Sequence, residues 1–184
     1  MSTNKTILKI TLSAMFLAIG IVLPFLTGQI QTVGQMLSPM HLPVLICGFI
    51  CGPIYSFLVG FTLPLLRSLM FGMPPMYPAS IAMAFEMGTY GALCGILYPI
   101  FSKIIKNKVV KLYPPLLISM VVGRVVWGIV RYLIASIDKT LVFNVNLFIS
   151  GALLTVWPGI IIQLVFVPLI VYAIEKTNIT ETLK

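Results

Sequence analysis

The sequence is poor in charge, and poorest in acid. Its 184 residues include 4 aspartates and glutamates, 12 lysines and arginines and 1 histidine, and only 9% of the chain is charged while 59% is hydrophobic. A water-soluble domain with this composition would expose large apolar patches. The shortage of charge therefore excludes a soluble fold and indicates an integral membrane protein, with room for about six helical spans and no separate soluble domain.

The same shortages exclude most catalytic chemistry. Glu86 is the only acid within a predicted span, so no second carboxylate shares acid–base work, and the single histidine, His41, cannot form a zinc motif of two histidines. Cys47, Cys51 and Cys94 lie in apolar runs and are interpreted as small packing residues, not as a disulfide framework. We therefore expect no enzyme, no metal site and no cofactor.

Six apolar runs are long enough, or nearly long enough, to cross a bilayer as helices. Only Gly52-Pro53 separates the second from the third, because the proline breaks the helical ladder and the glycine permits a tight turn. We predict an all-α membrane protein: one compact six-helix domain over residues 1–184, with a short second span. The predicted spans are about 8–26, 41–52, 53–71, 79–101, 113–136 and 149–174.

Basic residues predict the orientation, because short loops rich in lysine and arginine stay in the cytoplasm. With six spans, eight basic residues fall on one side of the membrane and only Lys139 falls on the other. Both termini are therefore expected to be cytoplasmic, and the net charge of +8 is interpreted as a topology signal and not as a nucleic-acid-binding surface. The eight are Lys5, Lys9, Lys103, Lys106, Lys108, Lys111, Lys176 and Lys184.

Three arginines and one glutamate lie well inside predicted spans, where charge is costly unless it faces a bundle interior or a water-filled cavity. From the helical rise, Arg67, Glu86 and Arg131 share a depth of roughly 6–10 Å below the outer end of their spans. Arg124 lies deeper, at roughly 20 Å. Arg124, Trp127 and Arg131 are spaced i, i+3 and i+7, so they share one face of the fifth span.

One glutamate cannot neutralise three arginines, so at least one cation needs another partner, and an anionic ligand supplies it. We therefore predict a ligand pocket open to the outside. Two alternatives stay open: an ion pair of Glu86 with Arg131 or Arg124 that only fixes helix packing, and an Arg67 that extends to the interface. The predicted pocket residues are Arg131, Trp127, Arg124, Glu86, Arg67, Asn144, Asn146, Gln163, His41, Gln35 and Tyr77.

Two uncharged loops lie on the pocket side. The first, "TGQIQTVGQMLSPM", is rich in amides and glycines and is predicted to fold over a bound small molecule; the second, "FGMPPMYPAS", contributes Tyr77. His41 follows the first loop and is either an interfacial residue or part of this lid. In the first span, Ala14 and Ala18 stand one turn apart and permit the close approach of another helix, and Gly91 and Gly95 repeat the pattern in the fourth span.

These features resemble the substrate-binding S components of energy-coupling factor (ECF) vitamin transporters, which are prokaryotic six-helix membrane proteins. The resemblance covers nearly the whole chain. Its stretches are Ala14-x-x-x-Ala18, the long loop after the first span, "MHLPVLICGFICGP" through the turn at Gly52-Pro53, and "RSLMFGMPP" followed by "AMAFEMGTYGALCGILY". Within the family, the second and third of these stretches look most like the branch assigned to pantothenate.

The resemblance implies a subunit of an ATP-driven vitamin importer in the prokaryotic plasma membrane. Such a subunit captures a vitamin from outside and binds a membrane scaffold subunit with two cytoplasmic ATPases. It then topples in the bilayer to deliver its ligand. The family docks on its scaffold through the Ala-x-x-x-Ala face, which here implies Ala14 and Ala18 as docking residues.

Several alternatives remain at this stage. Pantothenate is the leading ligand, because its carboxylate suits an arginine-rich pocket and its hydroxyls and amide suit Asn144, Asn146 and Gln163. A pyridoxine form, a thiamine-precursor pyrimidine and riboflavin are the other candidates, since Trp127 and Trp157 can stack on their rings. A membrane scaffold protein with no small ligand and a standalone channel are the alternatives of another class.

Overall fold

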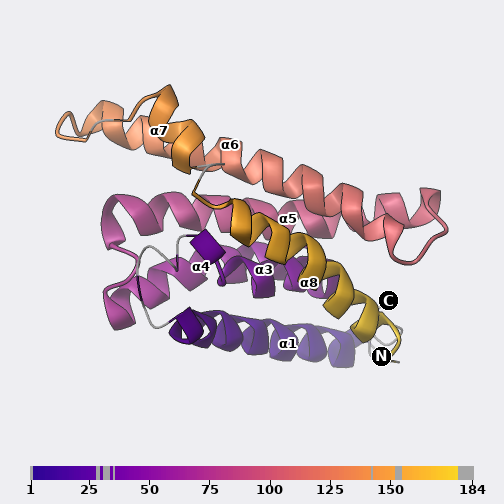
Figure 1. Cartoon of the computed structure of the whole chain (residues 1–184). Coiled ribbons are helices and arrows are strands. Elements are labelled where there is room, and N and C mark those ends of the chain that lie inside the picture. The colour runs from indigo at the N-terminus through magenta and orange to yellow at the C-terminus, as the bar shows by residue number, and fades with distance from the viewer. Residues whose placement is uncertain are drawn as a thin grey trace.

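The chain is described by a computed structural model, which covers residues 2–27, 30, 34, 36–141, 143–151 and 155–177 (Figure 1). Three short elements, η1 (Leu23–Thr27), η2 (Met76–Ser80) and η3 (Val110–Leu112), accompany seven α-helices in these ranges. The α-helices are α1 (Ser2–Val22), α3 (His41–Cys51), α4 (Pro53–Phe71), α5 (Ile81–Ile104), α6 (Tyr113–Ile137), α7 (Val145–Ile149) and α8 (Trp157–Glu175).

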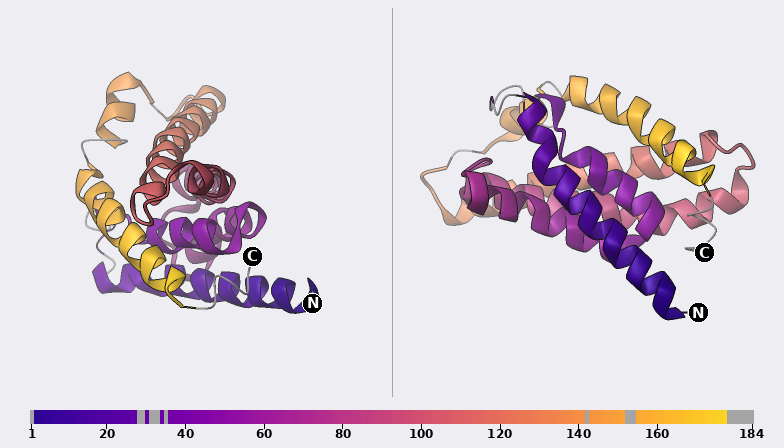
Figure 2. Two further views of the ribbon diagram at one scale, coloured as in Figure 1. Left: turned by 90° about the vertical axis from the view of Figure 1, so that its right-hand side faces the viewer. Right: turned by 90° about the horizontal axis from the view of Figure 1, so that it is seen from below.

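The helices run back and forth between two ends of the bundle. At one end α1 begins, α8 ends and α5 connects to α6; we call it the terminal end (right in Figure 1). At the other end lie the connections that follow α1, α4 and α6, with α7 beside them; we call it the cavity end. On one side of the bundle, α1 lies obliquely across α3 and α4 (Figure 2).

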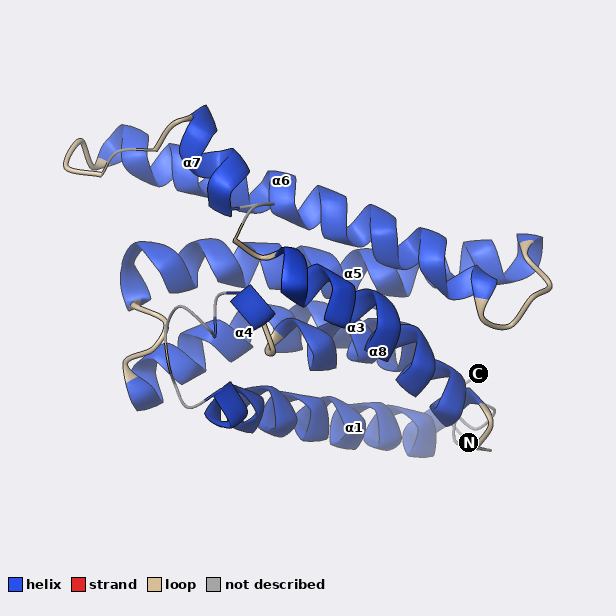
Figure 3. Cartoon of the chain, viewed as in Figure 1, coloured by secondary structure: helices blue, strands red, loops and turns tan. Residues whose placement is uncertain are grey.

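All regular elements of the described residues are helical, so the all-α prediction is confirmed (Figure 3). Five helical stretches are long and apolar enough to cross a bilayer, which makes the chain a multi-pass membrane protein. The shorter α3 spans 11 residues, 10 of which are buried. At about 1.5 Å per residue this helix is too short to cross a bilayer, and being apolar all round it forms the core, packed by α1, α4, α5 and α8.

One predicted boundary is wrong. The last span was expected to begin at residue 149, but α8 begins at Trp157, and the chain before it forms the short separate helix α7. Pro158 explains the difference, because a proline is favoured in the first turn of a helix and disfavoured in its interior.

Glycines set the closest helix contacts. Gly52, with φ of +89°, is the single residue between α3 and α4, and Pro53 occupies the first turn of α4. On α5, a Cβ at Gly91 would lie 2.7 Å from the carbonyl oxygen of Ser56, and one at Gly95 would lie 2.5 Å from the nitrogen of Pro53. These two glycines therefore serve packing inside the bundle.

Ala14 and Ala18, in contrast, are exposed on α1. The buried side of that helix is formed by Ser13, Phe16 and Gly20, spaced i, i+3 and i+7. The pair of alanines therefore lies on a surface that the rest of the chain does not cover.

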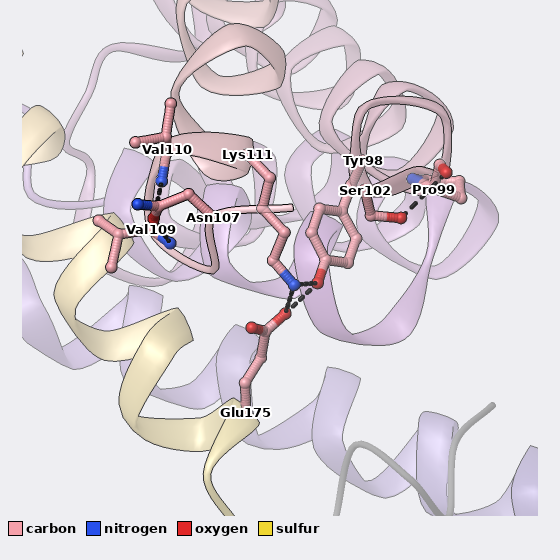
Figure 4. A network of polar contacts seen from close by, with 8 residues as sticks. All are labelled: Tyr98, Pro99, Ser102, Asn107, Val109, Val110, Lys111 and Glu175. Atoms are coloured by element: carbon pink, nitrogen blue, oxygen red, sulfur yellow. Dashed lines mark hydrogen bonds and ion pairs between the residues drawn. The ribbon is translucent and has the colours of Figure 1, made fainter. Parts of the chain in front are cut away.

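A polar cluster closes the terminal end (Figure 4). The Lys111 ammonium donates to the Tyr98 hydroxyl at 2.9 Å and to Glu175 Oε1 at 3.0 Å, and Tyr98 donates to the same carboxylate. These side chains come from the start of the η3–α6 segment, from α5 and from the end of α8. The cluster therefore ties the last turn of α8 to the α5–α6 hairpin.

Candidate ligand-binding site

A cavity of about 390 Å³ lies at the cavity end of the bundle, within the range of roughly 300–1,000 Å³ typical of small-molecule sites. Its wall combines α3, α4, α5 and α6 with η1 and the segments before α3, before α5 and between α6 and α8. Six predicted pocket residues line it: His41, Arg67, Glu86, Arg124, Trp127 and Arg131.

Glu86 is the centre of a buried network in this wall. Its side chain is 1% exposed, and its Oε1 lies 2.9 Å from Arg124 Nη1 and accepts a hydrogen bond of 2.7 Å from the Tyr90 hydroxyl. Nε2 of His41 lies 3.6 Å from the same oxygen. The sequence left open whether Glu86 pairs with Arg124 or with Arg131. In the structure it pairs with Arg124.

The predicted depth of Arg124 is wrong, since it lies level with Glu86. That depth assumes that the outer ends of the two helices lie at the same height in the membrane. Arg124 is far from the end of α6 and Glu86 is near the start of α5, so the two helices are staggered. Gly123 permits the contact, because a Cβ there would clash with the Tyr90 ring.

Arg67 is held by the protein itself. Its Nη1 donates to the carbonyl oxygen of Ile21 at 2.7 Å, and its guanidinium lies 5.1 Å and 5.4 Å from the ring centres of Phe25 and Phe71. The carbonyl belongs to the last turn of α1, where the helix dipole favours a cation. At 3% exposure, the Arg67 side chain is buried against these groups beside the cavity, which favours the pocket over the interface.

Arg131 is the cation whose bonding the described residues leave incomplete. Its Nε is buried and has no hydrogen-bond partner in the described ranges. Its guanidinium lies 5.7 Å from the ring centre of Phe143, and this ring offers Nε–H no oxygen acceptor. Because Glu86 is paired with Arg124, Arg67 and Arg131 are left as surplus cations in the cavity wall, and Arg131 is the one whose buried Nε also lacks an acceptor in the described ranges.

An aromatic cluster supports this part of the wall. Trp127 makes an edge contact with Phe143 at 5.8 Å between ring centres and stacks on Phe148 at 6.3 Å. Gly128 leaves room for the Phe148 ring and Gly151 for the indole. The cluster packs α7 and its flanking residues onto α6, and it gives the cavity an aromatic side.

Four predicted pocket residues are not among the lining residues. Asn144 is exposed, and its Oδ1 caps α7 by accepting the Leu147 amide at 2.9 Å. Asn146 is also exposed. Gln163 is buried within the packing of α8, at 2% exposure. Tyr77 is the fourth residue outside the lining.

Tyr77 contacts Asp138 at the end of α6 instead of lining the cavity. Its hydroxyl donates to Asp138 Oδ2 at 3.3 Å, which joins the segment before α5 to the end of α6. Hydrogen bonds from Thr140, one of them 2.6 Å from Oγ1 to Oδ1, lower the pKa of Asp138. Gln35 lies outside the described residues, as does much of the loop around it.

The wall also contains groups that the sequence analysis did not single out. Ser38, Ser150 and Thr155 contribute hydroxyls, and Phe143 contributes a ring. Isolated hydroxyls in apolar segments carry no periodic signal, so only the fold brings them to the cavity.

Comparison with known proteins identifies the class. The profile of the family "ECF transporter, substrate-specific component" matches residues 8–175, nearly the whole chain. The chain therefore belongs to this family, whose members are transport subunits that bind a vitamin and act with a scaffold and ATPases. Searches of curated proteins and of solved structures find no significant match.

Proposed function

We propose that the chain captures pantothenate from outside the cell and holds it in the cavity at the cavity end. The observation that carries the proposal is the surplus charge of Arg131, whose buried Nε has no partner in the described residues. A guanidinium favours a carboxylate above other partners, because its planar N–H groups match the two oxygens. A ligand with one carboxylate therefore completes the cavity.

The remaining wall suits the rest of pantothenate. Ser150 and Thr155 offer hydroxyls to its hydroxyl and amide groups, and the methionines and prolines of the wall suit its apolar carbons. Asn144, Asn146 and Tyr77 do not line the cavity, so the contacts predicted for them require the lid to close further. Riboflavin, a pyridoxine form or a pyrimidine would use Trp127 as a stacking surface instead.

Delivery follows from the family. We infer that the terminal end faces the cytoplasm, because its connection carries Lys103, Lys106 and Lys108. The exposed Ala14 and Ala18 suit close docking on a helix of the ECF scaffold, which acts with two ATPases. The protein then lies in a prokaryotic plasma membrane as one domain, in which five helices cross the bilayer and the short α3 is the sixth helix, in the core.

The test is titration calorimetry of the purified chain with pantothenate. We expect tight binding, and we expect Arg131→Ala to weaken it at least about tenfold, the loss of roughly one charge-assisted hydrogen bond. Lys139→Ala is the matched control, because Lys139 is an exposed cation near the same end. Equal affinity of Arg131→Ala and the unchanged chain contradicts the role of Arg131.

A thermal-shift screen of B vitamins tests the choice of ligand. Only a ligand bound by the folded state raises the unfolding temperature with concentration. A flavin or pyridoxal absorption spectrum that co-purifies with the protein contradicts pantothenate and supports stacking on Trp127. Stabilisation by no vitamin supports a scaffold without a small ligand.

A further inference from the structure

His41 is the one histidine of the chain, and its ring has a defined orientation. Nδ1 lies 3.2 Å from the carbonyl oxygen of Ser38. Because a carbonyl oxygen only accepts, Nδ1 carries a hydrogen. The same oxygen accepts the backbone N–H of His41 at 3.1 Å, and Ser38 has a φ of +45° in the left-handed region. Nε2 is therefore the nitrogen that gains or loses a proton.

Nε2 faces a carboxylate without a hydrogen bond to it. It lies 3.6 Å from Glu86 Oε1, is buried, and has no hydrogen-bond partner in the described residues, in a side chain that is 3% exposed. In the neutral ring, Nε2 directs a lone pair at this anion, which is unfavourable where the dielectric constant is low. A proton on Nε2 replaces that repulsion with an N–H aimed at the carboxylate.

The charged groups around His41 come from three of the helices that build the cavity. From α5, Glu86 faces Nε2 and the Tyr90 ring lies 5.4 Å from the imidazole. From α6, Arg124 pairs with the same carboxylate oxygen, and Arg131 lies in the same wall. Arg67 of α4 also lines it, bonded to Ile21. The titratable groups of α1 and α8 that pack on α3 lie toward the terminal end: Lys5, Lys9, Tyr172 and Glu175.

We infer that His41 is a proton-binding site coupled to the capture of an anionic ligand. The inference rests on the proposed function, because the cavity must take an anion. With a neutral ring, Arg124 neutralises Glu86 and Arg67 is bonded to Ile21, so Arg131 is the guanidinium left for the ligand. With the imidazolium, His41 neutralises Glu86, and Arg124 becomes available beside Arg131. Protonation thus gives the ligand carboxylate a second guanidinium.

The coupling has a definite direction. An anion in the cavity favours the imidazolium and, by linkage, the imidazolium favours the anion to the same extent. Affinity therefore rises as the pH falls, as long as the ligand carboxylate stays ionised, which holds above about pH 5. A ligand captured from an acidic exterior is held less tightly once the cavity meets a near-neutral cytoplasm.

The first experiment measures pantothenate affinity between about pH 5.5 and pH 8. The unchanged chain should bind about tenfold more tightly at the low end, a typical coupling. His41→Gln should bind weakly at every pH, since its neutral amide cannot release Arg124. Glu86→Gln should bind tightly at every pH, since Arg124 is then free throughout. Pantothenol, with an alcohol in place of the carboxylate, should show no such dependence on pH.

The second experiment needs no substitution. The protein is purified with a tag that lacks histidine, labelled with ¹⁵N-histidine and followed by NMR, so the imidazole signals come from His41 alone. Adding pantothenate at about pH 7 should place a proton on Nε2. Adding pantothenol should not.

The outcomes separate the two proposals. Pantothenate binding of equal strength at every pH, with an unchanged ring, overturns the coupling and leaves the proposed function standing. No pantothenate binding at any pH contradicts the proposed ligand, and with it this inference. Parallel pH dependence in the unchanged chain and in His41→Gln assigns the titration to another group and also overturns the coupling.

Discussion

At each end of the bundle, a glutamate bonds a tyrosine and a cation, yet the two clusters differ in net charge. At the terminal end, Glu175 meets Lys111, so one acid faces one base. At the cavity end, Glu86 meets Arg124, and Arg131 and Arg67 add two further cations. A balanced ion pair stabilises the packing of the helices that it joins. An excess of positive charge beside a cavity also favours an anionic ligand.

Among the substitutions that test this difference between the two clusters, Arg124→Leu should have the largest effect. It leaves Glu86 as a carboxylate that is 1% exposed and has lost its nearest cation. We expect the free energy of unfolding to fall by about 3–5 kcal/mol, the usual cost of removing one partner of a buried pair. Chemical or thermal unfolding in detergent measures it. Leu117→Ala on the exposed side of α6 is the control, and an equally small loss in both variants would contradict the network.

Lys111→Met tests the ion pair with Glu175 at the terminal end. The pair is 14–15% exposed, so we expect a loss of about 1 kcal/mol, nearer the value of a partly solvated pair. Pantothenate affinity should not change, because the cluster lies at the end opposite the cavity. Lys103→Met, at an exposed lysine nearby, should change neither quantity. A change in affinity on Lys111→Met would show that the terminal cluster is coupled to the cavity.

Ala14→Leu combined with Ala18→Leu should have the smallest effect on the isolated protein. Both side chains are exposed, so the larger ones displace only lipid, and unfolding and pantothenate binding should stay within experimental error. Uptake by cells that contain the scaffold and the ATPases should be abolished, because close helix docking is blocked. Met15→Leu, an exposed neighbour on α1, should keep uptake; loss of binding in the double variant would contradict a docking role.

Much of the fold could be predicted because its signals are local. Long apolar runs mark the helices, and Gly52-Pro53 marks the turn between α3 and α4. The limit of such signals is shown by two pairs of small residues with the same spacing. Gly91 and Gly95 are buried against α4, whereas Ala14 and Ala18 are exposed on α1. Spacing shows that two residues share a face, and it does not show what that face meets.

The candidate site was predictable in its charged residues and not in its polar ones. Arginines and a glutamate in apolar helices stand out, because their burial is so costly. No local pattern indicates that Asn144 caps α7. Ser150 and Thr155 line the cavity because α8 begins at Trp157, so both precede the helix.

The sequence by itself determined the class of protein, since its apolar runs and scarce charge leave no alternative to helices in a membrane, and it determined that cations outnumber acids among them. Only the tertiary structure decided that Glu86 pairs with Arg124, that Ile21 holds Arg67 and that Arg131 is left over. Helical periodicity is a property of one helix. Ion pairing depends on the relative height and rotation of two, which the packing of Gly123 on Tyr90 sets here.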